Sequence, residues 1–159
     1  MNSLIKNLSG VLHDTQSMRS DLMTILSDDD LRYRLPGNNI TLGELCKAIG
    51  EVEYSYIESL KTFKQDFNYH NDEPGMATSV EKLTAWFKAL DEQLETAMRC
   101  LSEADIQNKR VERGGGFRVP VDVQVHIYRE ALLIFYGKAS LYLRALEKDL
   151  PGLFPNWIG

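Results

Sequence analysis

Apolar residues recur at helical spacing in four long segments of the chain. Within each segment they lie mostly three or four positions apart, so they form one stripe on a helix with 3.6 residues per turn. The predicted helices lie within residues 2–27, 41–63, 78–101 and 122–148. Four helices of this length predict an all-α protein that folds as a four-helix bundle.

Two capping boxes mark where helices begin. Thr41 is followed three residues later by Glu44, and Thr78 is followed at the same spacing by Glu81. In such a box the threonine hydroxyl and the glutamate carboxylate each accept a hydrogen bond from the other residue's backbone N–H. We therefore expect the second helix to begin after Thr41 and the third after Thr78.

The stretches between the helices are rich in residues that break helices. They read SDDD, LPGNN, NYHNDEPG and RVERGGGFR. The segment VPVDVQV, residues 119–125, alternates strictly and could form a short strand. Because it contains Pro120 and has no evident strand partner, we prefer an extended lead into the fourth helix.

The fourth predicted helix carries more apolar surface than one bundle contact requires. On a helical wheel its apolar arc is roughly twice as wide as the ~100° stripe of a helix that packs on one side. The excess predicts a homodimer through this helix. The alternative is that this helix is the most central one of a monomer.

One lysine, Lys138, falls inside this apolar arc, and Glu53 falls at the edge of the apolar arc of the second helix. A buried charge without a partner costs several kcal/mol, so the two side chains could share one polar pocket. The alternative is that Lys138 reaches the solvent along its methylene stem while Glu53 is exposed.

Composition narrows the class of protein. The chain has 159 residues, which corresponds to one domain. Its net charge of -5 argues against nucleic acid and anionic lipid as main partners, and no apolar run reaches the ~20 residues that span a bilayer. Cys46 and Cys100 form no CxxC motif, so we expect reduced thiols and a cytoplasmic protein.

Two helical segments resemble the DinB/YfiT-like family of helical bundles. They are TLGELCKAIGEVE, residues 41–53, and FYGKASLYLRAL, residues 135–146; the ending FPNWIG is also similar to that family. The resemblance covers nearly the whole of residues 1–159 and implies one bundle domain with an up-down-down-up path.

The resemblance also implies a divalent metal, bound in that family by one histidine on the second helix and two on the fourth. Here those positions are Ala48, Ala131 and Phe135, while Lys138 stands where the family has a glutamine. Glu53 alone matches. We therefore expect no metal, and a pocket in which Lys138 supplies the positive charge of the missing cation.

The rest of the candidate pocket and the alternative ligands are few. Tyr56, on the apolar stripe of the second helix, completes the pocket candidates. His126 and Glu130 lie four residues apart and, with Asp122, could hold a metal, but they share the polar face of the fourth helix. The simpler interpretation is a solvated surface.

Three classes of function remain open. The first is a non-catalytic, dimeric bundle that binds a small molecule or a partner in the former active-site pocket and uses no cofactor. The second, implied by the resemblance, is a thiol-dependent transferase or hydrolase with a rebuilt site for a divalent metal such as Zn or Ni. The third is a stress-response protein that uses the basic segment 108–118 to bind an acidic partner. We expect the first, and no residue is assigned a catalytic role.

Overall fold

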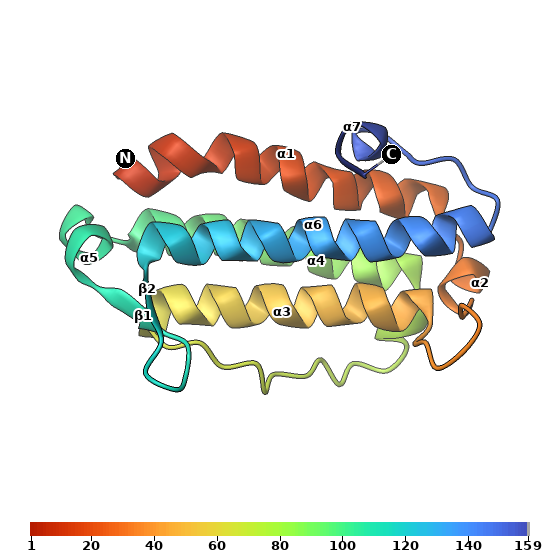
Figure 1. Ribbon diagram of the computed structural model, residues 1–159, viewed down its shortest axis with the longest axis horizontal. Coiled ribbons are helices and arrows are strands. Elements are labelled where there is room, and N and C mark those ends of the chain that lie inside the picture. Colours follow the sequence, from red (N-terminus) through yellow and green to blue (C-terminus); the bar gives the residue numbers. More distant parts are fainter. Residues whose placement is uncertain (159) are drawn as a thin grey trace.

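Four long helices form a bundle in the computed structural model, which describes residues 1–158 (Figure 1). They are α1 (Ser3–Ile25), α3 (Leu42–Thr62), α4 (Val80–Cys100) and α6 (Val121–Ala145). All four coincide with predicted helices to within a few residues, so the all-α class and the four-helix bundle are confirmed. No helix in residues 1–158 has the length and hydropathy to cross a membrane.

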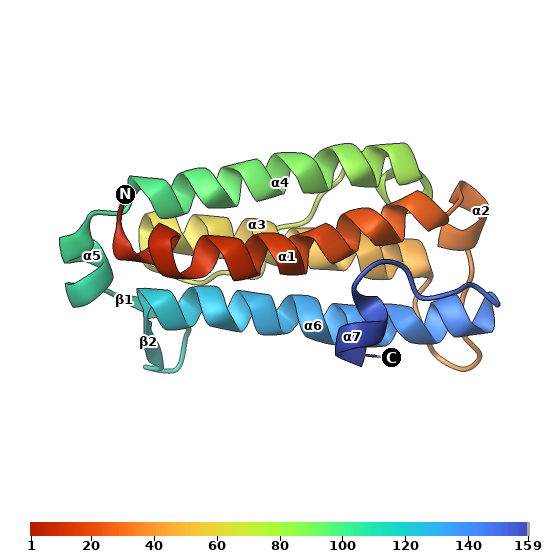
Figure 2. The same ribbon diagram turned by 90° about the horizontal axis from the view of Figure 1, so that it is seen from above.

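The path of the chain is up-down-down-up, as the resemblance implies. Helices α1 and α6 run in one direction, and α3 and α4 run in the other (Figures 1 and 2). The connection from α3 to α4, residues 63–79, therefore runs back along the length of the bundle. Helix α1 packs against α4 and α6, and α3 packs against the same two helices. Helices α1 and α3 thus lie diagonally opposite each other.

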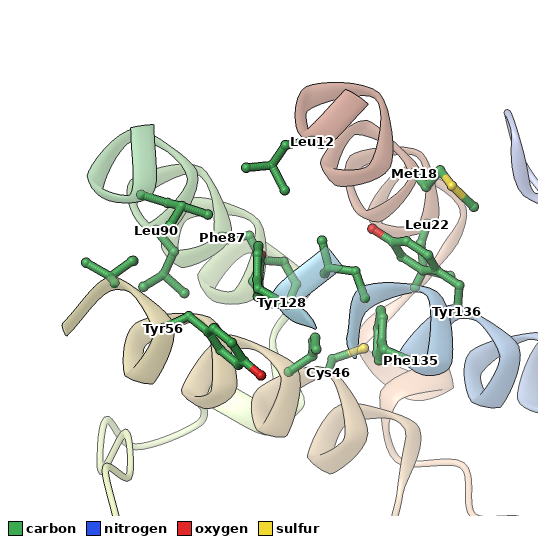
Figure 3. Close-up of a cluster of buried hydrophobic side chains, with 14 of the residues drawn as sticks. Leu12, Met18, Leu22, Cys46, Tyr56, Phe87, Leu90, Tyr128, Phe135 and Tyr136 are labelled. Carbon is green, nitrogen blue, oxygen red and sulfur yellow. The ribbon is translucent and has the colours of Figure 1, made fainter. Parts of the chain in front are cut away.

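The core lies along the axis between the four helices. Figure 3 shows side chains from all four that meet there. Each helix contributes one stripe of residues that are nearly inaccessible to solvent. They include Leu12, Met18 and Leu22 of α1, Cys46 and Tyr56 of α3, Phe87 and Leu90 of α4, and Tyr128, Phe135 and Tyr136 of α6. Burial of these stripes is the main force that holds the helices together.

One of the two predicted capping boxes is confirmed. The Thr41 hydroxyl accepts a hydrogen bond from the Glu44 N–H, and the Glu44 carboxylate accepts one from the Thr41 N–H. The box predicted at Thr78 is wrong. Residues Met76–Thr78 form a 3₁₀ turn, η1, and Ser79 caps α4 by accepting a hydrogen bond from the Lys82 N–H.

The connection before α6 is a short β-hairpin, which corrects the expectation of an extended lead without a partner. Strand β1 (Arg110–Glu112) pairs antiparallel with β2 (Arg118–Pro120), and Val111 lies opposite Val119. Three glycines, residues 114–116, have positive φ and reverse the chain between the strands. The strand ends at Pro120, and α6 begins at Val121.

Short helices complete the molecule. They are α2 (Asp28–Leu31), α5 (Glu103–Asn108) and α7 (Phe154–Ile158).

A glycine is required where η1 crosses α3, because a Cβ at Gly43 would overlap the carbonyl group of Ala77. A Cβ at Gly50 would similarly overlap the ring of Trp86, so this glycine allows α4 to pack closely on α3.

Candidate functional site

An ion-pair network lies at the centre of the bundle. The Arg19 Nη1 atom lies 2.6 Å from the Glu53 Oε2 atom, and its Nη2 atom lies 2.7 Å from the Asp91 Oδ1 atom. The Gln16 amide donates a further hydrogen bond of 3.2 Å to the other Glu53 oxygen. The side chains of Arg19 and Glu53 are 1% and 0% exposed, whereas that of Asp91 is 28% exposed. Three helices, α1, α3 and α4, therefore meet through one buried ion pair and a third charge, that of Asp91, which is partly open to water.

Arg19 reaches this position because it belongs to the buried stripe of α1. It lies seven residues after Leu12 and seven before Leu26, both of which are buried. Its guanidinium carbon lies 4.1 Å from the centre of the Phe87 ring, within the range of a cation–π contact. The arginine is thus fixed by two carboxylates and one aromatic face.

The single guanidinium of Arg19 pairs with two carboxylates, Glu53 and Asp91. The excess negative charge affects the pKa of Asp91. Burial raises the pKa of Asp91 to about 7, and the nearby Glu53 carboxylate adds to this effect, which the Arg19 cation only partly offsets. Burial lowers the pKa of Arg19, but the two carboxylates outweigh it and the net shift is upward. The titration of Asp91 is therefore brought close to neutral pH.

Two buried tyrosines of α6 border the network. The Tyr136 hydroxyl donates a 2.6 Å hydrogen bond to the Thr15 carbonyl oxygen. The Tyr128 hydroxyl has no hydrogen-bond partner within residues 1–158, although it is fully buried. Burial and the Glu53 carboxylate raise the pKa of Tyr128 well above its usual value, so this side chain stays neutral.

A groove between α1 and α4 connects the network to solvent. Its volume is about 510 Å³, and Gln16 and Asp91 line it together with His13 and the apolar side chains of Leu12 and Met98. The groove therefore combines apolar walls with a carboxyl group that titrates near neutral pH. A larger groove of about 780 Å³ lies beside α3, α4 and α5, but no member of the network lines it.

The pairing predicted between Lys138 and Glu53 is wrong. Lys138 is exposed on α6, while Glu53 is fully buried and bound by Arg19. The helical wheel placed Lys138 among apolar residues, but Ile134 and Leu141 beside it are themselves exposed. The positive charge that neutralises Glu53 thus comes from Arg19 of α1. The feature of the sequence that could have identified this partner is a cationic residue on the apolar stripe of the first helix.

The other predicted pocket residues lie on the facing helices α3 and α6. Ala48 and Ala131 are half-buried, and Phe135 and Tyr56 are buried. Alanine and phenylalanine carry no metal-donor atom, and no three His, Cys, Asp or Glu side chains in the described part of the chain form a metal-binding group. The residues present therefore do not fit the three-histidine metal site that the resemblance implies.

The weaker metal candidates are on the solvated face of α6. His126 and Glu130 are both exposed, as is Asp122. Among residues 1–158 they belong to no group of three metal-binding side chains. A catalytic zinc usually takes three protein ligands, so this face lacks the donor set of such a site.

The basic segment 108–118 is the β-hairpin and its flanks. Arg113 donates a 2.7 Å hydrogen bond to the Gln124 side chain and a 3.2 Å bond to the Tyr56 hydroxyl. Lys109 lies 4.2 Å from the centre of the Phe63 ring. Two of its basic side chains thus tie the hairpin to the end of the bundle.

Comparisons with known proteins agree with this architecture. The sequence model of the DinB superfamily matches residues 12–131. A solved structure, of a DinB-like protein from Bacillus subtilis, YjoA, is similar with a TM-score of 0.66 and 15% identity, over 95% of this chain and 97% of that one. At this identity the structural likeness shows the fold alone. A search of curated proteins finds no match. Because the superfamily model covers three quarters of the sequence, the chain belongs to the DinB superfamily.

Proposed function

We propose that this protein is a non-catalytic binding module in which an internal ion pair has replaced the metal of DinB-like relatives. The observation that carries the proposal is the state of Glu53, the residue that matches the family's glutamate. It is fully buried, and its two oxygens are taken by Arg19 and Gln16. A carboxylate that is inaccessible to solvent and neutralised by a guanidinium offers no free, accessible oxygen to a cation or a substrate.

The proposal places the small ligand in the groove between α1 and α4. Asp91 is the charged member of the network that reaches this groove, and burial brings the pKa of its carboxyl group to about 7. Such a group can donate or accept a hydrogen bond, while Leu12 and Met98 offer an apolar wall. A small molecule with one polar end and an apolar body suits this lining.

Metal analysis separates this proposal from the alternative of a metal-dependent transferase or hydrolase with a rebuilt site. The protein is purified without a metal-affinity tag, and bound Zn, Ni and Mn are quantified. The proposal expects substoichiometric metal and no thermal stabilisation by these ions. The matched control carries Ala48→His, Ala131→His and Phe135→His together and is expected to gain metal binding. Stoichiometric metal in the natural protein would overturn the proposal.

Ligand binding is tested by a thermal-shift screen of small amines, alcohols and carboxylic acids. The variant Gly10→Trp fills the groove, and a Cβ at Gly10 meets no atom within 4 Å, so the substitution is compatible with the backbone. The control Lys6→Trp adds the same side chain at an exposed position of α1 that does not line the groove. A true ligand stabilises the natural protein and the control but not the filled variant.

Two further parts of the proposal concern assembly and location. We propose, as the apolar arc of the fourth helix predicts, a homodimer through α6, since this helix exposes Ile134 and Leu141 to solvent. We also keep a cytoplasmic location, because Cys46 and Cys100 are free thiols, one of them exposed.

A further inference from the structure

One face of α6 exposes apolar side chains that the bundle leaves uncovered. Ile134 and Leu141 are 60% and 54% exposed, and Val123 is also exposed. Ile127 is half-buried on the same face. Residues seven apart on a helix differ by only ~20° in direction, so these four side chains form one stripe. The helix buries its opposite face against α1 and α3.

Helix α7 does not cover this stripe. It contacts α6 through Phe154, which meets Tyr136, and through Trp157, which lies 5.3 Å from the Arg129 guanidinium. Both α6 residues point away from the direction of Ile134 by more than a third of a turn on the helical wheel. Figure 1 shows α7 on the same side of α6 as α1, and in Figure 2 it overlies α6.

Charged residues flank the stripe in a pattern that is complementary to itself. Glu130 and Arg144 lie on one edge, and Lys138 lies on the other. All three are exposed, and none forms an ion pair with any of residues 1–158. Between the two edge charges lies Gly137, where a Cβ would meet nothing within 4 Å. The surface between Glu130 and Arg144 is therefore open.

We propose that a second copy of this chain docks antiparallel on this face, with a two-fold axis beside Gly137. This extends the dimeric part of the proposed function by fixing the orientation and register of the partner. A rotation about that point places Ile134 beside Leu141 of the partner subunit. The same rotation places Glu130 beside Arg144 of the partner subunit. Each pair occurs twice, because the interface is isologous.

The charges select this orientation over a parallel one. In a parallel pair the two-fold axis runs along the helices and exchanges the two edges, so Glu130 would face the edge of the partner's Lys138, which lies eight residues or ~12 Å further along the helix, and no close ion pair would form. In the antiparallel pair only Lys138 meets its own copy, since both lysines stay on the same edge near the axis. A lysine at such a position lowers the affinity while it restricts the register. The dimer is accordingly weak and concentration-dependent.

Sedimentation velocity of the untagged protein over a range of concentrations tests the interface. The double variant Ile134→Glu, Leu141→Glu should be monomeric at concentrations where the natural protein dimerises. The control Val11→Glu, at an exposed apolar position of α1, should dimerise normally. Lys138→Leu should tighten the dimer. A natural protein and a Lys138→Leu variant that both stay monomeric throughout would overturn the proposal, as would a dimer that the double variant leaves intact.

A charge-swap experiment tests the orientation. Glu130→Arg and Arg144→Glu should each weaken the dimer several-fold at low salt, and the two together should restore it. Circular dichroism and the melting temperature confirm that each variant is folded. If the combined variant is as weak as the single ones, the antiparallel register is wrong. These outcomes are independent of the metal analysis, so a failure of the dimer and a failure of the metal-free binding function can be told apart.

Discussion

Replacing Arg19 by methionine should destabilise the protein more than replacing any exposed arginine. Arg19→Met keeps the length and apolar stem of the side chain but removes two charged hydrogen bonds, of 2.6 and 2.7 Å. It leaves the Glu53 carboxylate at 0% exposure with Gln16 as its remaining hydrogen-bond partner. Breaking a buried pair in this way costs about 3–5 kcal/mol. For a chain of this size, that corresponds to a melting temperature lower by roughly 6–20 °C.

Urea denaturation and calorimetry of Arg19→Met measure this loss. The matched control is Arg99→Met, which removes an exposed pair with Glu95 and should cost at most ~1 kcal/mol. Adding Glu53→Gln to Arg19→Met removes the stranded charge and should recover most of the stability. A loss below ~1 kcal/mol for Arg19→Met, or a double variant no more stable than the single one, would refute the view that Arg19 neutralises Glu53.

Three further changes probe the same core. The pKa of Asp91 is raised from 3.8 to about 7, so the folded state binds this proton more tightly than the unfolded chain, and the stability it contributes is lost as pH rises through that interval. The free energy of unfolding of Asp91→Asn should therefore rise relative to that of the natural protein as pH increases. A difference between the two free energies that does not change with pH in urea titrations would contradict this. Tyr128→Phe removes a buried hydroxyl group without a hydrogen-bond partner. Its free energy of unfolding should stay unchanged or rise by up to ~1 kcal/mol, which the melting temperature would report. Gly43→Ala should cost about 1–3 kcal/mol because its methyl group overlaps the Ala77 carbonyl, whereas Gly10→Ala, where space is open, should be neutral or stabilising by denaturation.

The helical part of the fold could be predicted because it depends on local periodicity. The four apolar stripes identified α1, α3, α4 and α6 to within a few residues at each end. The box at Thr41 and Glu44 also follows from neighbouring residues alone. The hairpin before α6 could not be predicted with the same ease, since each strand has only three residues and its pattern becomes clear only beside its partner.

The candidate site depended on information that one helix does not contain. A helical wheel gave the direction of Lys138 relative to its own helix, but the width of the buried face depends on which neighbours pack there. Within residues 1–158, no neighbouring helix covers the part of α6 that carries Ile134, Lys138 and Leu141, so these three residues are exposed to solvent. The sequence placed Glu53 at the edge of its apolar arc and left burial and exposure both open; the structure buries it, and its partner comes from α1, which lies diagonally across the bundle.

The sequence by itself determined four amphipathic helices and the presence of charged residues on their apolar stripes, since hydrophobic spacing is a local property. Only the tertiary structure decided which charges meet. Arg19, Glu53 and Asp91 lie on three helices and are separated by 34 and 38 residues along the chain, positions 19, 53 and 91. Their pairing depends on the order and orientation in which the helices pack, and burial from water then makes the pairing matter energetically.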